Sequence, residues 1–162
     1  MHSNIYQISN KPISEDEYSD SNTYCDNSSD FADYIGDKYE GEERMFRIEN
    51  FAEIIKDVFA YKGNGEFSYK GPEALRKFKQ AWCDAIKKQV EALTTDNIFR
   101  DMNLFRISKI TKKTHLDASS RVDIEDWAGG AAYPLGELFE YADSQLKKGD
   151  CIYIGAVIDY HF

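Results

Sequence analysis

The sequence predicts an α+β fold, with about three main helices packed on a small mixed or antiparallel sheet. The first reason is residues 150–162, which are apolar on both faces of an extended chain and therefore suit a strand in the middle of a covered sheet. The second is helical apolar periodicity over 44–61, 72–94 and 134–147, between shorter strand-like stretches. The length of 162 residues favours one domain, spanning 1–162.

The C-terminal strand is the centre of the predicted sheet. Its two faces stay apolar until Asp159, and Gly149-Asp150 is a turn signal directly before it. The alternation places on one face Ile152, Ile154, Ala156, Ile158, Tyr160 and Phe162, and on the other Cys151, Tyr153, Gly155 and Val157. A strand of this kind marks the position of the hydrophobic core.

The N-terminal part begins with a short strand, residues 4–9, which Lys11-Pro12 ends because proline cannot donate to a strand ladder. Residues 14–29 are rich in Ser, Asn and Asp and are expected to form a mobile loop. The apolar residues that follow have helical spacing behind Asp30, a residue that suits a helix cap. They predict one or two turns of amphipathic helix and are Phe31, Tyr34, Ile35 and Tyr39.

Three longer helices follow. Residues 44–61 carry an apolar stripe and are stopped by Gly63-Asn64-Gly65, after which 67–69 suggest a short strand. Residues 72–94 show the strongest helical pattern and open with a proline, which suits the first turn. Residues 134–147 have acidic residues early and lysines late, as the helix dipole prefers.

The region between the last two helices is less regular. Residues 95–102 suggest a short helix, and the apolar residues of 105–107 alternate as in a strand. Residues 122–124 alternate between apolar and charged side chains, which predicts a half-exposed strand. Pairing these two strands would place the bases of the first near the acids of the second, which favours a hairpin-like pair.

The net charge of −9 is concentrated in residues 15–43, which hold eleven acidic residues and one basic residue. Residues 44–162 hold equal numbers of both signs. Four tyrosines lie among the acids, and tyrosine supplies contact area at protein interfaces. We therefore predict a soluble, non-enzymatic interaction protein whose segment 15–43 engages a basic protein partner. The residues assigned to this contact are Tyr18, Asp20, Tyr24, Asp26, Asp30, Tyr34, Tyr39 and Glu42.

A DNA mimic, which blocks a DNA-binding enzyme by presenting carboxylates in place of phosphates, is the second interpretation. Mimicry needs charges in a rigid array near the phosphate spacing of a duplex, about one per 1.7 Å of axis. A Ser/Asn-rich segment fixes charges poorly, so mimicry ranks below docking. Direct binding of nucleic acid is disfavoured because the net negative charge repels it, although Lys109, Lys112 and Lys113 form a small basic cluster.

The third interpretation is a small enzyme centred on His115, with Asp117 beside it. His115 is the histidine best suited to proton transfer near neutral pH, because His2 and His161 lie near the chain ends. No serine lies in a G-x-S-x-G elbow. A non-enzymatic role is therefore favoured.

Neither a cofactor nor a metal is expected. The stretch 127–134 contains two glycines and runs into a helix, but Pro134 removes one N–H and Glu137 adds an anion where a phosphate would bind. We expect this stretch to be a tight backbone crossing. The His-Asp pairs at His115 and His161 each offer two ligands, without the Cys or His partners that zinc sites use.

The three cysteines, Cys25, Cys83 and Cys151, show no close spacing, which favours a reducing compartment. The first residues lack a basic region followed by an apolar run, so no signal peptide is expected. No apolar run approaches the roughly 18 residues of a membrane span. The expected location is the cytoplasm.

Overall fold

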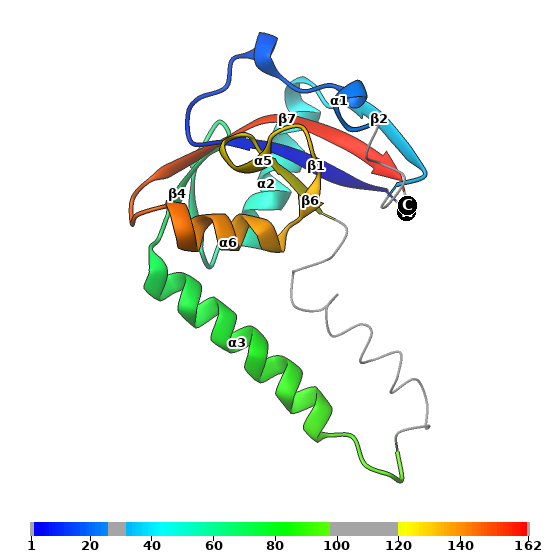
Figure 1. Cartoon of the computed structure of the whole chain (residues 1–162), viewed down its shortest axis with the longest axis vertical. Coiled ribbons are helices and arrows are strands. Elements are labelled where there is room, and N and C mark those ends of the chain that lie inside the picture. Colours follow the sequence, from blue (N-terminus) through cyan, green and yellow to red (C-terminus); the bar gives the residue numbers. More distant parts are fainter. Residues whose placement is uncertain (1, 26–31, 98–119, 162) are drawn as a thin grey trace.

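The computed structural model describes residues 2–25, 32–97 and 120–161. These residues form a mixed sheet whose strands run in the order β3-β4-β7-β1-β5-β6, with β2 paired to β7 beside this path (Figure 1). The strands are β1 (His2–Ser9), β2 (Tyr34–Lys38), β3 (Phe59–Gly63), β4 (Glu66–Tyr69), β5 (Arg121–Ile124), β6 (Tyr133–Pro134) and β7 (Cys151–His161). The helices are η1 (Glu15–Glu17), α1 (Ser21–Cys25), α2 (Gly41–Ile55), α3 (Pro72–Glu91), α5 (Glu125–Ala128) and α6 (Gly136–Gln145).

The prediction of an α+β domain centred on the C-terminal strand is confirmed. β7 pairs with β1 in antiparallel fashion from His2↔His161 to Ser9↔Tyr153. On its other edge β7 pairs with β4 through residues 151–153 and with β2 through residues 158–161. The longest strand of the sheet therefore holds three neighbours together.

The alternation along β7 is interrupted, and this corrects the predicted division of its faces. Tyr6 lies opposite Val157 while Ile8 lies opposite Ile154, so β7 carries one extra residue across from Gln7. Such a bulge shifts the phase of the side chains that follow it. Ile152, Ile154 and Val157 consequently share one core cluster, whereas Ala156, Ile158 and Tyr160 belong to another.

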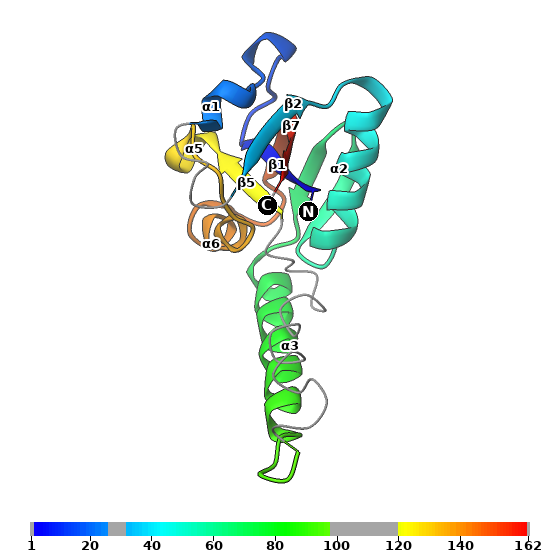
Figure 2. The ribbon, with the colours of Figure 1, turned by 90° about the vertical axis from the view of Figure 1, so that its right-hand side faces the viewer.

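Two hydrophobic clusters form the core. The larger contains buried residues of β1, β4, β5 and β7 with those of α2 and α6. The smaller lies where η1, α1 and β2 cover the sheet, and Ile5, Tyr24, Ile35 and Tyr160 belong to it. Figure 2 shows α2 and α1 on opposite sides of the sheet. Both faces of the central strands are therefore covered, as their apolar sequence requires.

The helix expected over 44–61 is confirmed as far as Ile55 and is wrong over residues 56–61. α2 ends at Ile55, and Phe59–Gly63 forms β3, which turns directly into β4. The turn uses positive φ angles at Gly63, Asn64 and Gly65, of 99°, 50° and 79°. The Gly-Asn-Gly sequence is thus a hairpin turn, for which such residues are suited.

The amphipathic helix expected around Tyr34 and Tyr39 is also wrong, because Tyr34–Lys38 is the strand β2. The C-terminal half of β7 has an edge that β4 does not reach, and β2 fills it. Backbone pairing with this edge prevails over a short helix of marginal intrinsic stability. Ile35 is thereby buried while Tyr34 stays 63% exposed.

The predicted loop over 14–29 contains structure in its described part, namely η1 and α1, whose Tyr24 is buried. β5 is also more buried than expected, since Val122, Asp123 and Ile124 are all inaccessible. β5 pairs in parallel with β1 and antiparallel with β6. The predicted strand 105–107 lies outside the described residues, and so does most of the predicted helix 95–102.

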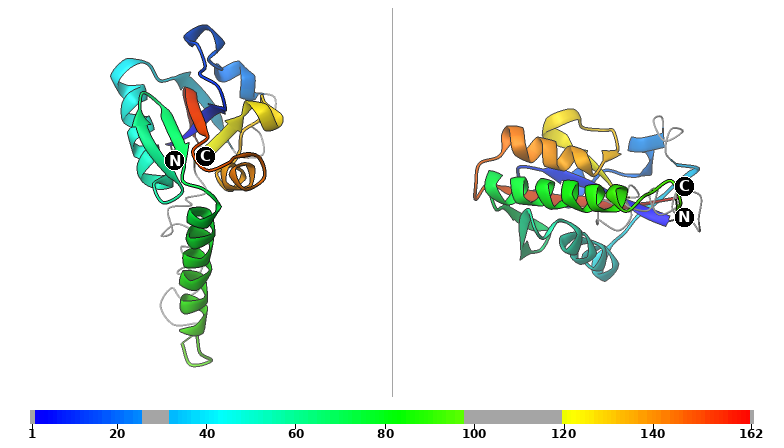
Figure 3. Two further views of the ribbon diagram at one scale, coloured as in Figure 1. Left: turned by 90° about the vertical axis from the view of Figure 1, so that its left-hand side faces the viewer. Right: turned by 90° about the horizontal axis from the view of Figure 1, so that it is seen from below.

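The other two predicted helices are confirmed with shorter bounds. α6 starts at Gly136 because Tyr133–Pro134 pairs with β5. α3 projects away from the sheet and contacts α6 at its base (Figures 1 and 3). The contact includes the rings of Phe78 and Phe139, whose centroids are 5.0 Å apart. Within the described residues no helix is long and apolar enough to cross a membrane.

Candidate functional site

The best-formed surface site lies at a gap along one edge of β7. Residues 151–153 of β7 pair with β4 and residues 158–161 pair with β2, so neither strand pairs with the residues between. Arg44, in the first turns of α2, fills the gap. Its Nε donates to the carbonyl of Gly155 at 2.8 Å and its Nη2 to the carbonyl of Ile154 at 2.6 Å. The planar guanidinium thus satisfies two backbone acceptors that would otherwise lack a partner strand.

The bulge in β7 creates this pair of acceptors, and Gln7 holds the bulge from the β1 side. Gln7 is buried, and its Oε1 accepts from the backbone N–H of Ala156 at 2.9 Å and of Ser19 at 3.0 Å. Its Nε2 donates to the carbonyl of Glu17 at 3.0 Å. One glutamine therefore joins β1, β7 and the segment that carries η1.

Gly155 is required at the bulge by close packing. A Cβ atom at this position would lie 2.6 Å from the Gln7 Oε1 and 2.8 Å from the Ile13 Cδ1. Contacts this short force a shift of the neighbouring atoms. The glycine, the buried glutamine and the arginine therefore form one structural unit around the bulge.

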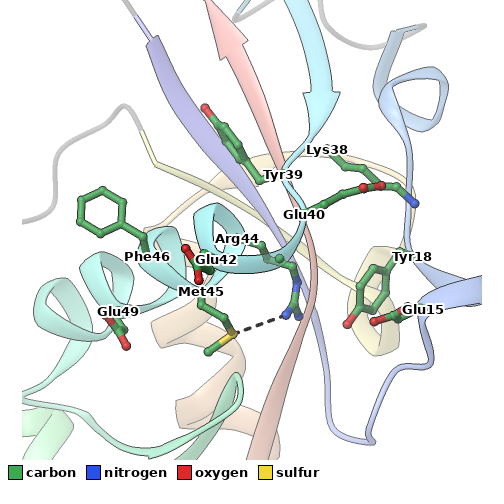
Figure 4. A pocket seen from close by; sticks show the side chains of 11 residues that line it. Glu15, Tyr18, Lys38, Tyr39, Glu40, Glu42, Arg44, Met45, Phe46 and Glu49 are labelled. Atoms are coloured by element: carbon green, nitrogen blue, oxygen red, sulfur yellow. Dashed lines mark hydrogen bonds between the residues drawn. The ribbon is translucent and has the colours of Figure 1, made fainter.

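A pocket of about 780 Å³ surrounds Arg44, and we call it the Arg44 pocket (Figure 4). Tyr18 and Glu15 lie on one side of the arginine in this view, and Glu42 and Met45 lie on the other. The Tyr18 ring centroid is 4.9 Å from the guanidinium carbon, within the range of a cation–π contact. The lining residues are Glu15, Tyr18, Lys38, Tyr39, Glu40, Gly41, Glu42, Arg44, Met45, Phe46 and Glu49.

The lining is acidic overall. Four carboxylates line the pocket, from Glu15, Glu40, Glu42 and Glu49, against the two cations Lys38 and Arg44. All four glutamates are exposed, whereas Arg44 is half-buried and bound to the β7 carbonyls. The pocket therefore presents negative charge to solvent around a fixed cation.

Aromatic side chains supply the apolar part of the lining. Phe46 is 57% exposed, so most of its ring is available for contact. Tyr39 is held in place, because its hydroxyl donates to Asp159 Oδ1 at 3.0 Å and the guanidinium of Arg47 lies 4.6 Å from its ring centroid. Burial, followed by the bond to Asp159, raises the pKa of Tyr39 to about 12. Tyr39 is therefore a neutral, ordered wall at physiological pH.

Three of the residues assigned to partner contact from the sequence line this pocket, namely Tyr18, Tyr39 and Glu42. Asp26 and Asp30 lie outside the described residues. The structure thus brings together side chains from both ends of segment 15–43.

The other assigned residues lie elsewhere. Tyr24 is 1% exposed, and its hydroxyl donates to Asp123 Oδ2 at 2.8 Å, so its ring belongs to the core and offers no contact area to a partner. Asp20 caps α1, since its Oδ1 accepts from the N–H of Asn22 at 2.9 Å. Tyr34 is exposed on β2 but does not line the pocket.

Sequence reasoning missed the central residues of the site. Arg44 lies just past the acidic segment, and no motif signals that it binds strand carbonyls. Phe46 falls outside the apolar stripe of its helix and reads as an isolated surface residue. A signal for Gly155 did exist, since a glycine inside a strand often marks a bulge or a close approach.

The residues considered for catalysis and metal binding give no assembled centre in the described part of the chain. His115 and Asp117 lie outside it. His2 Nδ1 lies 3.0 Å from Asp159 Oδ2, and the rings of His2 and His161 meet edge to face at 5.2 Å. No group of three or more metal-ligating side chains occurs among the described residues.

The stretch 127–134 forms a backbone hydrogen bond to the side-chain carboxylate of Asp123. The N–H of Gly130 donates to Asp123 Oδ1 at 3.1 Å, beside the bond from Tyr24. Burial of Asp123 raises its carboxyl pKa, while these hydrogen bonds act in the opposite direction. The turn therefore serves to hold a buried anion.

Fold and site together define a single α+β domain with an acidic, aromatic pocket at a gap in its central sheet. Comparison of the chain with protein-family models, with curated proteins and with solved structures finds no match. The geometry of the Arg44 pocket is therefore the basis for assigning a function.

Proposed function

We propose that this protein is a non-enzymatic binding protein that receives a basic segment of a protein partner in the Arg44 pocket. The observation that carries the proposal is the convergence of four exposed glutamates on a pocket with aromatic walls. A lysine or arginine side chain has a long apolar stem and a cationic head, which match such a lining. The pocket is formed by residues 15–18 and 38–49, so it retains the predicted role for the two ends of the acidic segment.

The Arg44 cation does not prevent this binding. Two of its nitrogen atoms are directed at β7 carbonyls, and its side chain is half-buried, whereas the four glutamates of the lining are exposed. Glu43, which neighbours the pocket, is bound to Arg47 at 3.2 Å and contributes little free charge. The partner's cations would therefore meet the rim glutamates first, and binding should weaken as salt screens the exposed charges.

DNA mimicry remains the second candidate, and one observation favours it. Part of the acidic segment is held firmly, because Gln7 binds the backbone of Glu17 and Ser19 and because Tyr24 is buried. Rigidity is what a mimic needs. However, Asp20 and Glu17 are used as caps of short helices, so their carboxylates point to local backbone groups rather than forming an outward row.

The proposal is tested with a synthetic lysine-rich peptide titrated into the purified protein by calorimetry at two salt concentrations. The triple variant Glu40→Gln, Glu42→Gln and Glu49→Gln should bind about tenfold or more weakly, at about 0.5–1 kcal/mol for each lost pair. The matched control is the triple variant Glu53→Gln, Glu73→Gln and Glu91→Gln, which removes the same charge from exposed sites outside the pocket.

Equal weakening by the two triple variants would contradict the pocket as the binding site, since only the overall charge would then matter. Mimicry has its own readout. A mimic should compete with duplex DNA for a DNA-binding domain, and the pocket variant should lose no more of that competition than the control.

A further inference from the structure

A second group of reactive side chains lies at the other end of the sheet, where β3, β4 and β7 meet. Cys151 opens β7, Glu66 opens β4 and Lys62 lies in β3. The Lys62 Nζ is 3.3 Å from the Cys151 Sγ and 3.2 Å from the Glu66 Oε1. The Glu66 Oε1 is also 3.3 Å from the Cys151 Sγ. A thiol, an amine and a carboxylate are therefore in mutual contact.

This group is open to small molecules. The side chains of Lys62 and Glu66 are 47% and 35% exposed, and Cys151 is half-buried. A separate cavity of about 520 Å³ borders Cys151, with Asn10 and Tyr141 also in its lining. The partial exposure of all three side chains leaves this group accessible from solvent.

The two neighbours of Cys151 suit the chemistry of a reactive thiol. The Lys62 Nζ and the Glu66 Oε1 each lie 3.3 Å from the sulfur, so a nitrogen nucleophile and a hydrogen-bond acceptor are both in contact with the thiol. The same contacts raise the pKa of Lys62, the hydrogen bond to Cys151 first and that to Glu66 second. An ammonium has no free electron pair, so Lys62 must lose a proton before its nitrogen can attack the oxidised sulfur.

We propose that Cys151 and Lys62 form a covalent sulfur–nitrogen cross-link when hydrogen peroxide oxidises the thiol. In the first step the Cys151 sulfur attacks peroxide, which gives a sulfenic acid and water. In the second, the neutral Lys62 amine attacks that sulfur, an S–N bond forms, and the sulfenic oxygen leaves as water. In sum, one thiol, one amine and one hydrogen peroxide give one sulfenamide and two waters, with sulfur oxidised by two electrons and peroxide reduced by two.

The contact distance explains why the amine would act before a second thiol does. The Lys62 nitrogen is already in contact with the sulfur, so the second step needs no diffusion and only a small approach. The bond would join β3 directly to β7 across β4. It would be reversible, because a sulfenic acid and its condensation products are reduced by thiols.

The test treats the full-length protein with hydrogen peroxide and measures its mass and its tryptic peptides. The expected product is lighter than the reduced protein by two hydrogen atoms, about 2 Da. Trypsin should no longer cleave after Lys62, and the peptides that contain Lys62 and Cys151 should appear joined. Dithiothreitol should restore both the mass and the cleavage.

Two variants and one internal control make the result decisive. Lys62→Arg keeps a cation beside Cys151, but its guanidinium stays protonated, so the cross-link should be lost while the sulfenic acid is trapped by dimedone. Cys151→Ser should lose both products, and Cys83, an exposed thiol on α3, reports how unspecific the oxidation is. Normal tryptic cleavage at Lys62 in oxidised wild-type protein, or an equal mass loss in Lys62→Arg, would overturn the proposal.

Discussion

At the scale of single residues, the most informative side chains are polar groups that replace missing backbone partners. Arg44 donates to two carbonyls of β7 where no strand pairs. Gln7 accepts from the N–H of Ala156 in the β7 bulge and from the N–H of Ser19 in the segment that follows η1. Buried backbone groups must be satisfied, and here side chains do so. Neither role follows a sequence motif, which is why Arg44 and Gln7 could not be assigned to the site from the sequence, although Tyr18, Tyr39 and Glu42 were.

Replacing Arg44 with methionine should destabilise the protein. Two charge-assisted hydrogen bonds are lost and two carbonyls are left unsatisfied, which should cost about 3 kcal/mol. Urea unfolding of Arg44→Met measures this cost. The control is Arg76→Met, whose arginine forms an exposed ion pair with Glu73 at 3.0 Å and should contribute less than about 1 kcal/mol. Equal effects in the two variants would show that the Arg44 bonds do not support the sheet.

Asp123→Asn should also destabilise the fold, by about 1–3 kcal/mol. The carboxylate accepts from both the Tyr24 hydroxyl and the Gly130 N–H, whereas the NH2 group of an asparagine would face one of these donors.

The contribution of Asp123 to stability depends on pH with a definite sign. Burial raises the folded-state pKa of Asp123 above the ordinary carboxyl value of 3.8, so the folded protein holds this proton more tightly than the unfolded chain. The contribution of Asp123 to the free energy of unfolding is therefore full below the ordinary carboxyl pKa and falls as pH rises through the raised pKa of the folded state. The difference in unfolding free energy between wild type and Asp123→Asn, followed from pH 3 to pH 7, would contradict this if it grew with pH.

At the scale of the elements, the long helices, the central strand and the short strands β1, β4 and β5 were predicted, whereas β2, β3 and β6 were not. α3 and β7 have many residues with one consistent periodicity, so the local pattern determines the element. β2 is short, and its identity depends on the open edge of β7, which lies far away in the sequence; β3 is also short, and its identity depends on pairing with β4 across the hairpin turn. Tertiary pairing of this kind is invisible to local periodicity.

Gly155→Ala tests the bulge in β7. The added Cβ would lie too close to Gln7 and Ile13, so we expect a loss of about 1–3 kcal/mol in thermal or urea unfolding. Gly136→Ala is the matched control, because nothing lies within 4 Å of a Cβ at that position in α6. This control should be neutral or slightly stabilising, as alanine is in a helix. A wild-type melting temperature for Gly155→Ala would mean that the bulge yields easily.

At the scale of the whole molecule, the acidic segment is part of the fold rather than an appendage. Tyr24 and Ile35 belong to the smaller core cluster, and Tyr18 packs against it. The charge distribution predicted a segment with a separate function, but charge does not reveal that buried tyrosines anchor it. The proposed binding role and the stability of the fold therefore involve the same described parts of residues 15–43, so point substitutions in the pocket are cleaner tests than deletions.

Ile154→Asp should unfold the domain. Ile154 is 4% exposed in the larger core cluster, at the point where α2 meets the central strand. Burying an unpaired carboxylate there costs at least several kcal/mol, which is comparable to the total stability of a small domain. Circular dichroism and size-exclusion chromatography should show an unfolded or aggregated chain. A monomer with the wild-type melting temperature would contradict the central position of β7.

The pairing of β1 with β7 also bears on how quickly the molecule folds. His2 pairs with His161 at the end of the innermost ladder, and its side chain lies 3.0 Å from that of Asp159, 157 positions away in the chain. Closing so long a loop costs conformational entropy before any contact rewards it, and folding rates fall as the mean separation of contacting residues rises. α3 and the β3–β4 hairpin can form from local contacts alone. The ladder that joins them into one sheet must form late, and we expect this step to set the refolding rate.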